Sequence, residues 1–285
     1  GRACLRAAAR AGHHVLAISR RPAPPAPADG VRWITADLNE PSSYGDAVAA
    51  FVPDATIHLA WDGIPDYGLE NSLRNAAAGA RFAERVFAAG CRRLVAGGSC
   101  WEYGGLEGRV RECDVPRAVG VFGACKTAQR EVMAALAQAA GASLAWARIF
   151  YAYGPGQKAA SLAPSLCADL LAGHEPRPRT PLAVNDFVFV DDVAEALVQL
   201  AQTDETGIFN VGSGSGVTVA EFAAVLAAAA GCPRPQVPAN GCGTSRGLVA
   251  DINRLEALGW VPRTPLPTGI AMTWSWFQRE RRAPC

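Results

Sequence analysis

The chain has 285 residues, of which 50% are hydrophobic and 19% charged, a balance typical of a folded protein with a sizeable core. A formal net charge of +1 provides no broad basic field and argues against nucleic acid as a partner. No apolar run approaches the roughly 18 uncharged residues of a membrane span, and the start of the sequence has no signal-peptide pattern. The nine cysteines are odd in number and form no Cys-x-x-Cys pair, so we expect reduced thiols and a cytoplasmic location.

The first half of the chain alternates short apolar strands with helices. Residues 1–12 already have the pattern of a helix that ends in a glycine cap at Gly12, so we expect a further strand upstream of this sequence. Apolar strands separated by helices indicate a parallel sheet covered on both faces. The predicted strands are His14–Ser19, Val31–Thr35, Ala55–Leu59, Arg93–Ala96 and Ser143–Arg148, and the predicted helices are Ser43–Phe51, Leu69–Ala89 and Ala124–Ala139.

Beyond residue 150 the order of elements becomes less regular. A proline-rich stretch at Pro176–Pro181 and a glycine-rich link at Asn240–Gly247 interrupt the pattern. We therefore expect one α/β domain in residues 1–150 and a second, smaller one in residues 151–285. The elements predicted there are helices at Ala160–Ala172, Asp192–Gln202, Val219–Ala230 and Thr268–Arg279, and a strand at Phe187–Val190.

Candidate ligand-binding residues lie where the predicted strands end. Ligands of open α/β sheets bind at the carboxyl ends of the strands, so the residues at and directly after each strand end are the first candidates for ligand binding. They are Ser19, Arg20 and Arg21 at one strand, Asp37 and Leu38 after the next, Leu59, Ala60 and Trp61 after a third, and Ser99, Cys100, Trp101 and Tyr103 after a fourth.

Together with Phe122-Gly-Ala-Cys-Lys126 and Arg148-Ile-Phe-Tyr-Ala-Tyr-Gly-Pro-Gly156, these motifs resemble the extended short-chain dehydrogenase/reductase family of nucleotide-sugar epimerases, dehydratases and ketoreductases. The resemblance covers essentially the whole chain. It implies a Rossmann-type doubly wound parallel sheet that binds NAD(P) in residues 1–150. The smaller α/β domain in residues 151–285 would be mainly substrate-binding, with some segments returning to the Rossmann sheet. It also implies a homodimer formed by Leu69–Ala89 and Ala124–Ala139.

The resemblance assigns one set of residues to the cofactor. Gly1 matches the last glycine of a Gly-x-x-Gly-x-x-Gly turn, where the backbone approaches the pyrophosphate at a helix N-terminus; the turn's first two glycines are absent from this sequence. No acidic residue follows the strand that ends at Ser19, so we favour NADP(H) over NAD(H), with two solvated arginines as the alternative interpretation. The assigned cofactor residues are Gly1, Ser19, Arg20, Arg21, Asp37, Leu38, Leu59, Ala60, Trp61 and Lys126.

The same resemblance assigns catalytic roles to Ser99, Phe122 and Lys126. The Gly98–Gly104 segment is similar to a Ser-Ser-x-x-Val-Tyr-Gly motif in which Ser99 takes the place of the hydroxyl that bonds the reacting sugar oxygen. Lys126 takes the place of the lysine that holds the nicotinamide ribose. Phe122 stands where the family carries the tyrosine that moves the proton, and a phenyl ring transfers none.

Three interpretations of Phe122 remain open. It can be an engineered Tyr→Phe change that traps a bound substrate. It can be natural, in an enzyme that recruits Tyr103, Tyr151 or a water held by Ser99. It can also mark a protein that binds cofactor without turnover.

Substrate contacts are expected from a third set of residues. Dehydratases of the resembled family follow the serine with an Asp-Glu pair, and Cys100-Trp101 in its place argues against dehydration. Tyr151 replaces an asparagine that often meets the sugar diphosphate, and Arg246 is a candidate phosphate contact or a surface charge. The full set is Ser99, Cys100, Trp101, Tyr103, Tyr151 and Arg246.

No metal site is expected, because the four histidines have no spacing suited to a ligand set.

The resemblance implies a reductase or epimerase that acts on a nucleotide-linked sugar. The alternative from another class is a non-catalytic NADP(H) sensor with the same fold. A sensor would bind NADPH without oxidising it.

Overall fold

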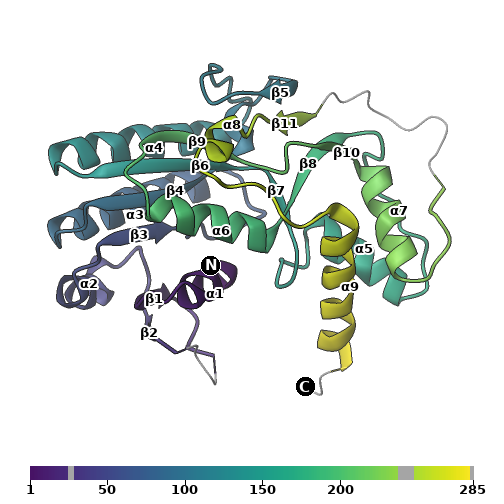
Figure 1. Ribbon diagram of the computed structural model, residues 1–285, viewed down its shortest axis with the longest axis horizontal. Coiled ribbons are helices and arrows are strands. Elements are labelled where there is room, and N and C mark those ends of the chain that lie inside the picture. Colours follow the sequence, from purple (N-terminus) through teal and green to yellow (C-terminus); the bar gives the residue numbers. More distant parts are fainter. Residues whose placement is uncertain (25–28, 237–246, 283–285) are drawn as a thin grey trace. The chain divides into compact units, whose positions relative to one another are not determined.

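The computed structural model describes residues 1–24, 29–236 and 247–282, which fold into two compact units (Figure 1). The first unit contains Gly1–Gly105, Val115–Arg148 and Ala194–Phe209. The second contains Leu106–Asp114, Ile149–Val193 and the described residues from Asn210 onward. Within the described residues, no helix is both long and apolar enough to cross a membrane.

The first unit alternates strands and helices as the sequence predicts. A two-stranded parallel sheet pairs β1 with β2, and a four-stranded sheet has the order β3-β4-β6-β9, with β3 and β4 parallel. The helices are α1 (Arg2–Arg10), α2 (Gly45–Phe51), α3 (Leu69–Ala88), α4 (Val121–Ala139) and α6 (Val190–Ala201), and the strands are β1 (Val15–Ser19), β2 (Val31–Thr35), β3 (Ala55–His58), β4 (Arg93–Ser99), β6 (Ser143–Ile149) and β9 (Gly207–Val211).

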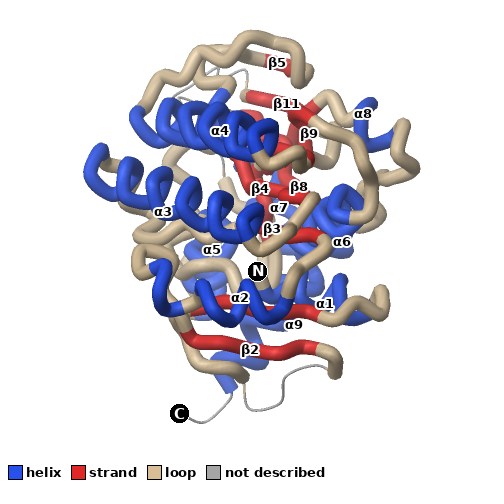
Figure 2. Tube along the Cα trace, turned by 90° about the vertical axis from the view of Figure 1, so that its left-hand side faces the viewer, coloured by secondary structure: helices blue, strands red, loops and turns tan. Residues whose placement is uncertain are grey.

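Helices cover both faces of the first unit's strands. Figure 2 shows α3 and α4 on one side of β3 and β4, with α1 and α6 on the other. The apolar stripes of α3 and α4 meet the sheet in one buried core, as expected for amphipathic helices packed on strands. Its members include Phe82 and Val86 from α3, Met133 and Ala137 from α4, and Leu94 and Trp146 from the strands. The predicted α/β fold with a Rossmann-type parallel sheet is confirmed.

The second unit is built from shorter strands and three longer helices. Strands β7 and β8 pair in parallel and β10 joins β8 antiparallel, while β5 and β11 form a parallel pair. Its core is rich in aromatic rings, including Tyr153, Phe187, Phe189 and Phe222. The elements are β5 (Gly108–Val110), β7 (Tyr151–Tyr153), α5 (Leu162–Leu171), β8 (Val184–Phe189), β10 (Gly216–Thr218), α7 (Val219–Ala229), β11 (Leu248–Ala250), α8 (Asn253–Glu256) and α9 (Leu266–Arg282).

The structure differs from the predicted elements mainly in two ways. The three-residue strands β5, β7, β10 and β11 were not predicted, because three residues are too few for an alternating pattern to show. The five-residue strand β9 was also not predicted. Helix α4 begins at Val121 rather than Ala124. The earlier start matters because Phe122 and Lys126 become residues i and i+4 of one helix and share a face.

Close packing of α3 against α4 depends on Gly79. A methyl group at this position would overlap the Gln129 amide nitrogen and come within 2.8 Å of His58 Nε2. Gly79→Ala is expected to lower the free energy of unfolding by about 1–3 kcal/mol through overpacking, measured by urea denaturation. Gly45→Ala on α2 is the matched control, since its methyl meets nothing within 4 Å. Equal stability of the two variants would contradict the packing argument.

Candidate active site

Ser99 ends β4 and begins a short 3₁₀ helix, Cys100–Glu102. Its hydroxyl oxygen accepts a hydrogen bond from Trp101 N at 3.2 Å, and its own backbone N–H donates to Glu102 Oε1 at 2.9 Å. This reciprocal capping box fixes the backbone on both sides of the serine. Within the described residues, the hydroxyl proton has no acceptor, so it is available to an oxygen of a ligand.

The Glu102 carboxylate points inward and holds this turn in place. Besides Ser99 N, its Oε1 accepts from Trp146 Nε1 at 2.9 Å, and its Oε2 accepts from Arg148 Nε at 3.0 Å. The Glu102 and Arg148 side chains are both fully buried. The Arg148 guanidinium lies 4.4 Å from the Tyr103 ring centroid, and Tyr103 is itself fully buried. Glu102 and Tyr103 therefore support the turn that carries Ser99.

Phe122 and Lys126 lie in the first two turns of α4, next to this serine turn. The helix can start there because residue 123 is glycine: a Cβ would come within 2.5 Å of the Trp101 carbonyl oxygen. Lys126 Nζ donates to the Gly97 carbonyl at 2.7 Å and lies 4.0 Å from the centroid of the Trp61 ring. Burial lowers the pKa of Lys126 to about 7, although the Glu102 carboxylate opposes that shift.

Phe122 is the centre of an aromatic cluster formed by Trp61, Tyr67, Trp101 and Phe122. Its ring lies edge-on to the other three, with centroids at 5.1 Å from Trp61, 5.1 Å from Tyr67 and 5.7 Å from Trp101. Tyr67 and Trp101 also contact each other at 4.8 Å. Edge-to-face packing at these distances is favourable for aromatic rings. The cluster places one phenol, that of Tyr67, beside the ring that stands at the expected tyrosine position.

Two asparagines of α3 position the loop that carries Trp61 and Tyr67. Asn71 Nδ2 donates to the Asp62 and Asp66 carbonyls, and Asn75 Oδ1 accepts from Asp62 N. Both side chains are buried. The loop is therefore tied to α3 by side-chain amides at several points.

The residues assigned to the cofactor lie on α1 and at the strand ends. Gly1 caps α1, whose first turn holds no acidic residue. The Arg20 guanidinium pairs with Asp62, with Nη1 to Oδ2 at 3.0 Å, whereas the Arg21 guanidinium has no partner among the described residues. Asp37 Oδ1 accepts from Asn39 N at 2.9 Å, and these hydrogen bonds lower the pKa of Asp37. Leu38 and Leu59 are half-buried, and Ala60 is exposed.

One orphaned ring nitrogen tests whether a cofactor fits here. Trp61 Nε1 is buried without a hydrogen-bond partner on the loop after β3, whereas the unpaired His58 Nε2 faces Gly79 of α3 in the core. Burial, with the nearby Lys126 charge, lowers the pKa of His58 to about 3, so this ring stays neutral. Uncapped N–H groups at the start of α1 and the free Arg21 guanidinium suit an anionic dinucleotide. The residues present therefore fit NAD(P).

The remaining predicted substrate residues belong to both units. Cys100 is buried, and Trp101, at 41% exposed, forms the outer edge of the aromatic cluster. In the second unit, Tyr151 lies on β7 with its ring 6.1 Å from that of Phe187. Arg246 lies outside the described residues. No group of three or more metal-ligating side chains is found in the described part of the chain.

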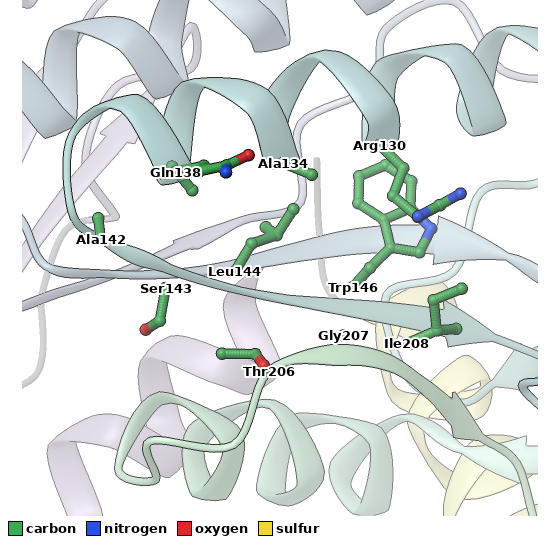
Figure 3. Close-up of a pocket in the computed structure, with 11 residues that line it drawn as sticks. Arg130, Ala134, Gln138, Ala142, Ser143, Leu144, Trp146, Thr206, Gly207 and Ile208 are labelled. Carbon is green, nitrogen blue, oxygen red and sulfur yellow. The ribbon is translucent and has the colours of Figure 1, made fainter.

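A separate hollow of about 330 Å³ opens between α4 and the strands β6 and β9 (Figure 3). Leu144 and Trp146 line it on the sheet side and Arg130 and Gln138 on the helix side. None of the predicted site residues lines it. The candidate active site is therefore the strand-end cluster and not this hollow.

Sequence reasoning did not find Tyr67 or Asn75. Neither belongs to a motif of the resembled family, and their roles depend on how the 61–67 loop folds back on α3 and α4. The Pro65-Asp-Tyr-Gly68 run signals only a turn. No local pattern identifies the partner of the Tyr67 ring.

Comparison with known proteins gives a consistent result. The dTDP-L-rhamnose 4-epimerase of Burkholderia thailandensis is 27% identical over 331 residues, covering 96% of this chain and 91% of that protein. The dTDP-6-deoxy-L-talose 4-dehydrogenase (NAD(P)(+)) of Kitasatospora kifunensis is 29% identical over 286 residues, covering 93% and 88%. The structure of MoeE5 in complex with UDP-glucuronic acid and NAD is 30% identical, covers 98% and 96% of the two chains, and has a TM-score of 0.81.

The model of the NAD dependent epimerase/dehydratase family matches residues 1–212. That span includes the first unit, with the serine turn, the aromatic cluster and the Phe122–Lys126 helix. The chain belongs to the NAD dependent epimerase/dehydratase family.

Proposed function

We propose that this protein is an NAD(P)-dependent oxidoreductase that acts on a nucleotide-linked sugar, as a ketoreductase or an epimerase. The observation that carries the proposal is the position of Lys126. One helical turn after residue 122, its ammonium lies against Gly97 and Trp61, next to the turn that carries Ser99. The names of the two curated relatives, a sugar-nucleotide epimerase and a sugar-nucleotide dehydrogenase, support the substrate class.

The residues divide the work of a carbonyl reduction. The nicotinamide supplies or accepts hydride at one sugar carbon when it is bound. Ser99 has a free hydroxyl proton with which to bond the sugar oxygen at that carbon. Lys126 holds the nicotinamide ribose, and its low pKa near neutrality reflects a desolvated, apolar setting in which charges act strongly. Trp61 and Trp101 exclude water from this setting with their rings.

Cys100 and Trp101 support reduction or epimerisation over dehydration. Elimination of water from a sugar needs one group to remove a proton from carbon and another to protonate the leaving hydroxyl. A buried thiol and an indole offer neither. We therefore do not assign dehydratase activity.

Arg21 supports a preference for NADP(H). Its guanidinium is free to pair with a 2′-phosphate, whereas Arg20 is already paired with Asp62. Arg21→Ala is expected to weaken NADPH binding about tenfold or more and to leave NADH binding nearly unchanged, since a charge-assisted bond to phosphate contributes about 1.5–3 kcal/mol.

Fluorescence titration with both cofactors measures the effect of Arg21→Ala. Arg32→Ala is the matched control, because it removes an equal charge from the neighbouring strand β2. If the unaltered protein binds NADH as tightly as NADPH, the preference for NADP(H) is wrong. An equal loss from the Arg32 variant would indicate a general charge effect instead.

Phe122 favours a second candidate, a non-catalytic NADP(H) sensor. A protein that only reports cofactor binding has no need of a proton donor at position 122. The experiment that separates the two is NADPH oxidation with a panel of nucleotide-linked 4-keto-6-deoxy sugars, comparing this protein with its Phe122→Tyr variant. Turnover by either supports a ketoreductase, whereas NADPH binding without turnover by both supports the sensor or an epimerase that keeps its cofactor.

We further propose a cytoplasmic homodimer that pairs α3 and α4 across a two-fold axis. Leu73 on α3 and Val132 on α4 are 53% and 48% exposed, and apolar side chains of this size on helix surfaces suit such a contact.

A further inference from the structure

Reduction of a ketone needs a proton as well as a hydride, and Phe122 cannot give one. The proton must come from a group that reaches the sugar oxygen also bonded by Ser99. One phenol lies next to Phe122, since the Tyr67 ring centroid lies 5.1 Å from that of Phe122 and 4.8 Å from that of Trp101. Tyr67 thus lies beside the ring that stands where the family carries its proton donor.

The other tyrosines are less well placed for this role. Tyr103 is fully buried beneath the Arg148 guanidinium. Tyr44 is also buried and packs on Phe82 in the core. The Tyr151 ring packs on that of Phe187, and Tyr153 Oη donates to the Leu266 carbonyl. Among the described residues, only Tyr67 brings a phenol ring into contact with Phe122.

The Tyr67 hydroxyl is available for proton transfer. It makes no hydrogen bond to any group in the described part of the chain, and the side chain is half-buried, so it can exchange protons with water. Burial raises the pKa of Tyr67 above its usual value. The phenol therefore carries its proton at neutral pH, as a donor must, and the raised pKa makes it a weaker acid than an exposed tyrosine.

Tyr67 is also held firmly enough to act at a fixed point. The loop that carries it is bound to α3 through Asn71, whose amide donates to the Asp66 carbonyl at 2.8 Å, next to Tyr67 itself. The Ser72 hydroxyl donates to the Tyr67 carbonyl at 3.4 Å. A positioned acid of this kind contributes about 10²- to 10⁴-fold to a rate.

From this placement we infer that Tyr67 replaces the missing tyrosine as the proton donor in carbonyl reduction. The inference rests on the proposed function. NADPH bound here would supply the hydride that the sugar carbonyl carbon takes up and would itself be oxidised to NADP⁺. The C=O π electrons move onto oxygen, the Tyr67 O–H bond breaks to give that oxygen its proton, and the ketone becomes an alcohol. The Tyr67 phenolate regains a proton from water.

The test is a double-substitution cycle that compares Tyr67→Phe in two backgrounds. In the protein with Phe122, Tyr67→Phe is expected to lower the kcat for NADPH-dependent reduction of a nucleotide-linked 4-keto-6-deoxy sugar at least about 50-fold. In the Phe122→Tyr background the same change is expected to cost less than about fivefold, because tyrosine at position 122 now supplies the proton. A hydroxyl with a purely structural role would cost the same in both backgrounds.

Tyr44→Phe is the matched control, since it removes a buried phenol from the same unit outside the site. It is expected to leave kcat unchanged, and NADPH affinity is expected to stay the same in all variants. Three results would overturn the role of Tyr67 and leave the proposed function standing. They are an unchanged kcat in Tyr67→Phe, an equal loss of kcat in both backgrounds, and turnover only in the Phe122→Tyr protein. No turnover in any variant, including Phe122→Tyr, would overturn the proposed ketoreductase activity itself.

Discussion

Restoring a tyrosine at position 122 of the Tyr67→Phe protein, which has neither phenol, is expected to raise turnover with a nucleotide-linked ketosugar about 100-fold or more. The added hydroxyl would lie one helical turn before Lys126, whose ammonium stabilises a phenolate and so eases proton transfer. The ring itself already fits, because Phe122 packs edge-on to three aromatic neighbours. The rate is measured as loss of NADPH absorbance with saturating cofactor.

The control for this change is Phe122→Leu, which alters the ring without adding a hydroxyl. It is expected to leave turnover the same or lower it, because the aromatic cluster loses its central member. If Phe122→Tyr and Phe122→Leu have the same rate, the hydroxyl at position 122 has no catalytic use in this protein. Equal, measurable rates would indicate that the proton comes from a group other than residue 122, and no turnover by either variant would favour the sensor.

Replacing Glu102 by glutamine is expected to produce the largest loss of stability, about 3–5 kcal/mol. The change leaves the fully buried Arg148 guanidinium without its counter-charge. The glutamine NH₂ group would also face a hydrogen-bond donor, because both carboxylate oxygens of Glu102 accept hydrogen bonds. Their donors are Ser99 N, Trp146 Nε1 and Arg148 Nε. Urea denaturation measures the free energy of unfolding.

Glu131→Gln is the matched control for the Glu102 change. Glu131 pairs with Arg130 and is 63% exposed, so the loss of this pair is expected to cost no more than about 1 kcal/mol. Combining Glu102→Gln with Arg148→Met is expected to recover part of the stability, since it removes the uncompensated charge. Similar unfolding free energies for Glu102→Gln and Glu131→Gln would contradict the structural role of the buried carboxylate.

Much of the fold is predictable from local pattern. The strands β1, β2, β3, β4 and β6 of the first unit are runs of four to seven residues, long enough for hydrophobic periodicity to show, whereas the five-residue β9 was not predicted. The three-residue strands of the second unit, such as β5 and β7, leave no comparable signal because their pairing depends on residues far away in the sequence.

The candidate site, like the fold, could be predicted only in part from the sequence. Ser99 and Lys126 could be predicted because they belong to motifs with fixed spacing at a strand end and along a helix. The position of Tyr67 could not, because it depends on amides of Asn71 and Asn75 that tie the 61–67 loop to α3. The inward direction of Glu102 is understandable only once Trp146 and Arg148 are seen beneath it.

The most direct test of the proposed oxidoreductase is transfer of deuterium from NADPH to a sugar. The Phe122→Tyr protein is incubated with nucleotide-linked 4-keto-6-deoxy sugars and with NADPH deuterated at one or the other face of nicotinamide C4. The masses of the sugar products are then measured by mass spectrometry. We expect a sugar product that gains one deuterium from one of the two deuterated forms of NADPH. NADPH binding, shown by fluorescence titration, without deuterium in any sugar would contradict this expectation.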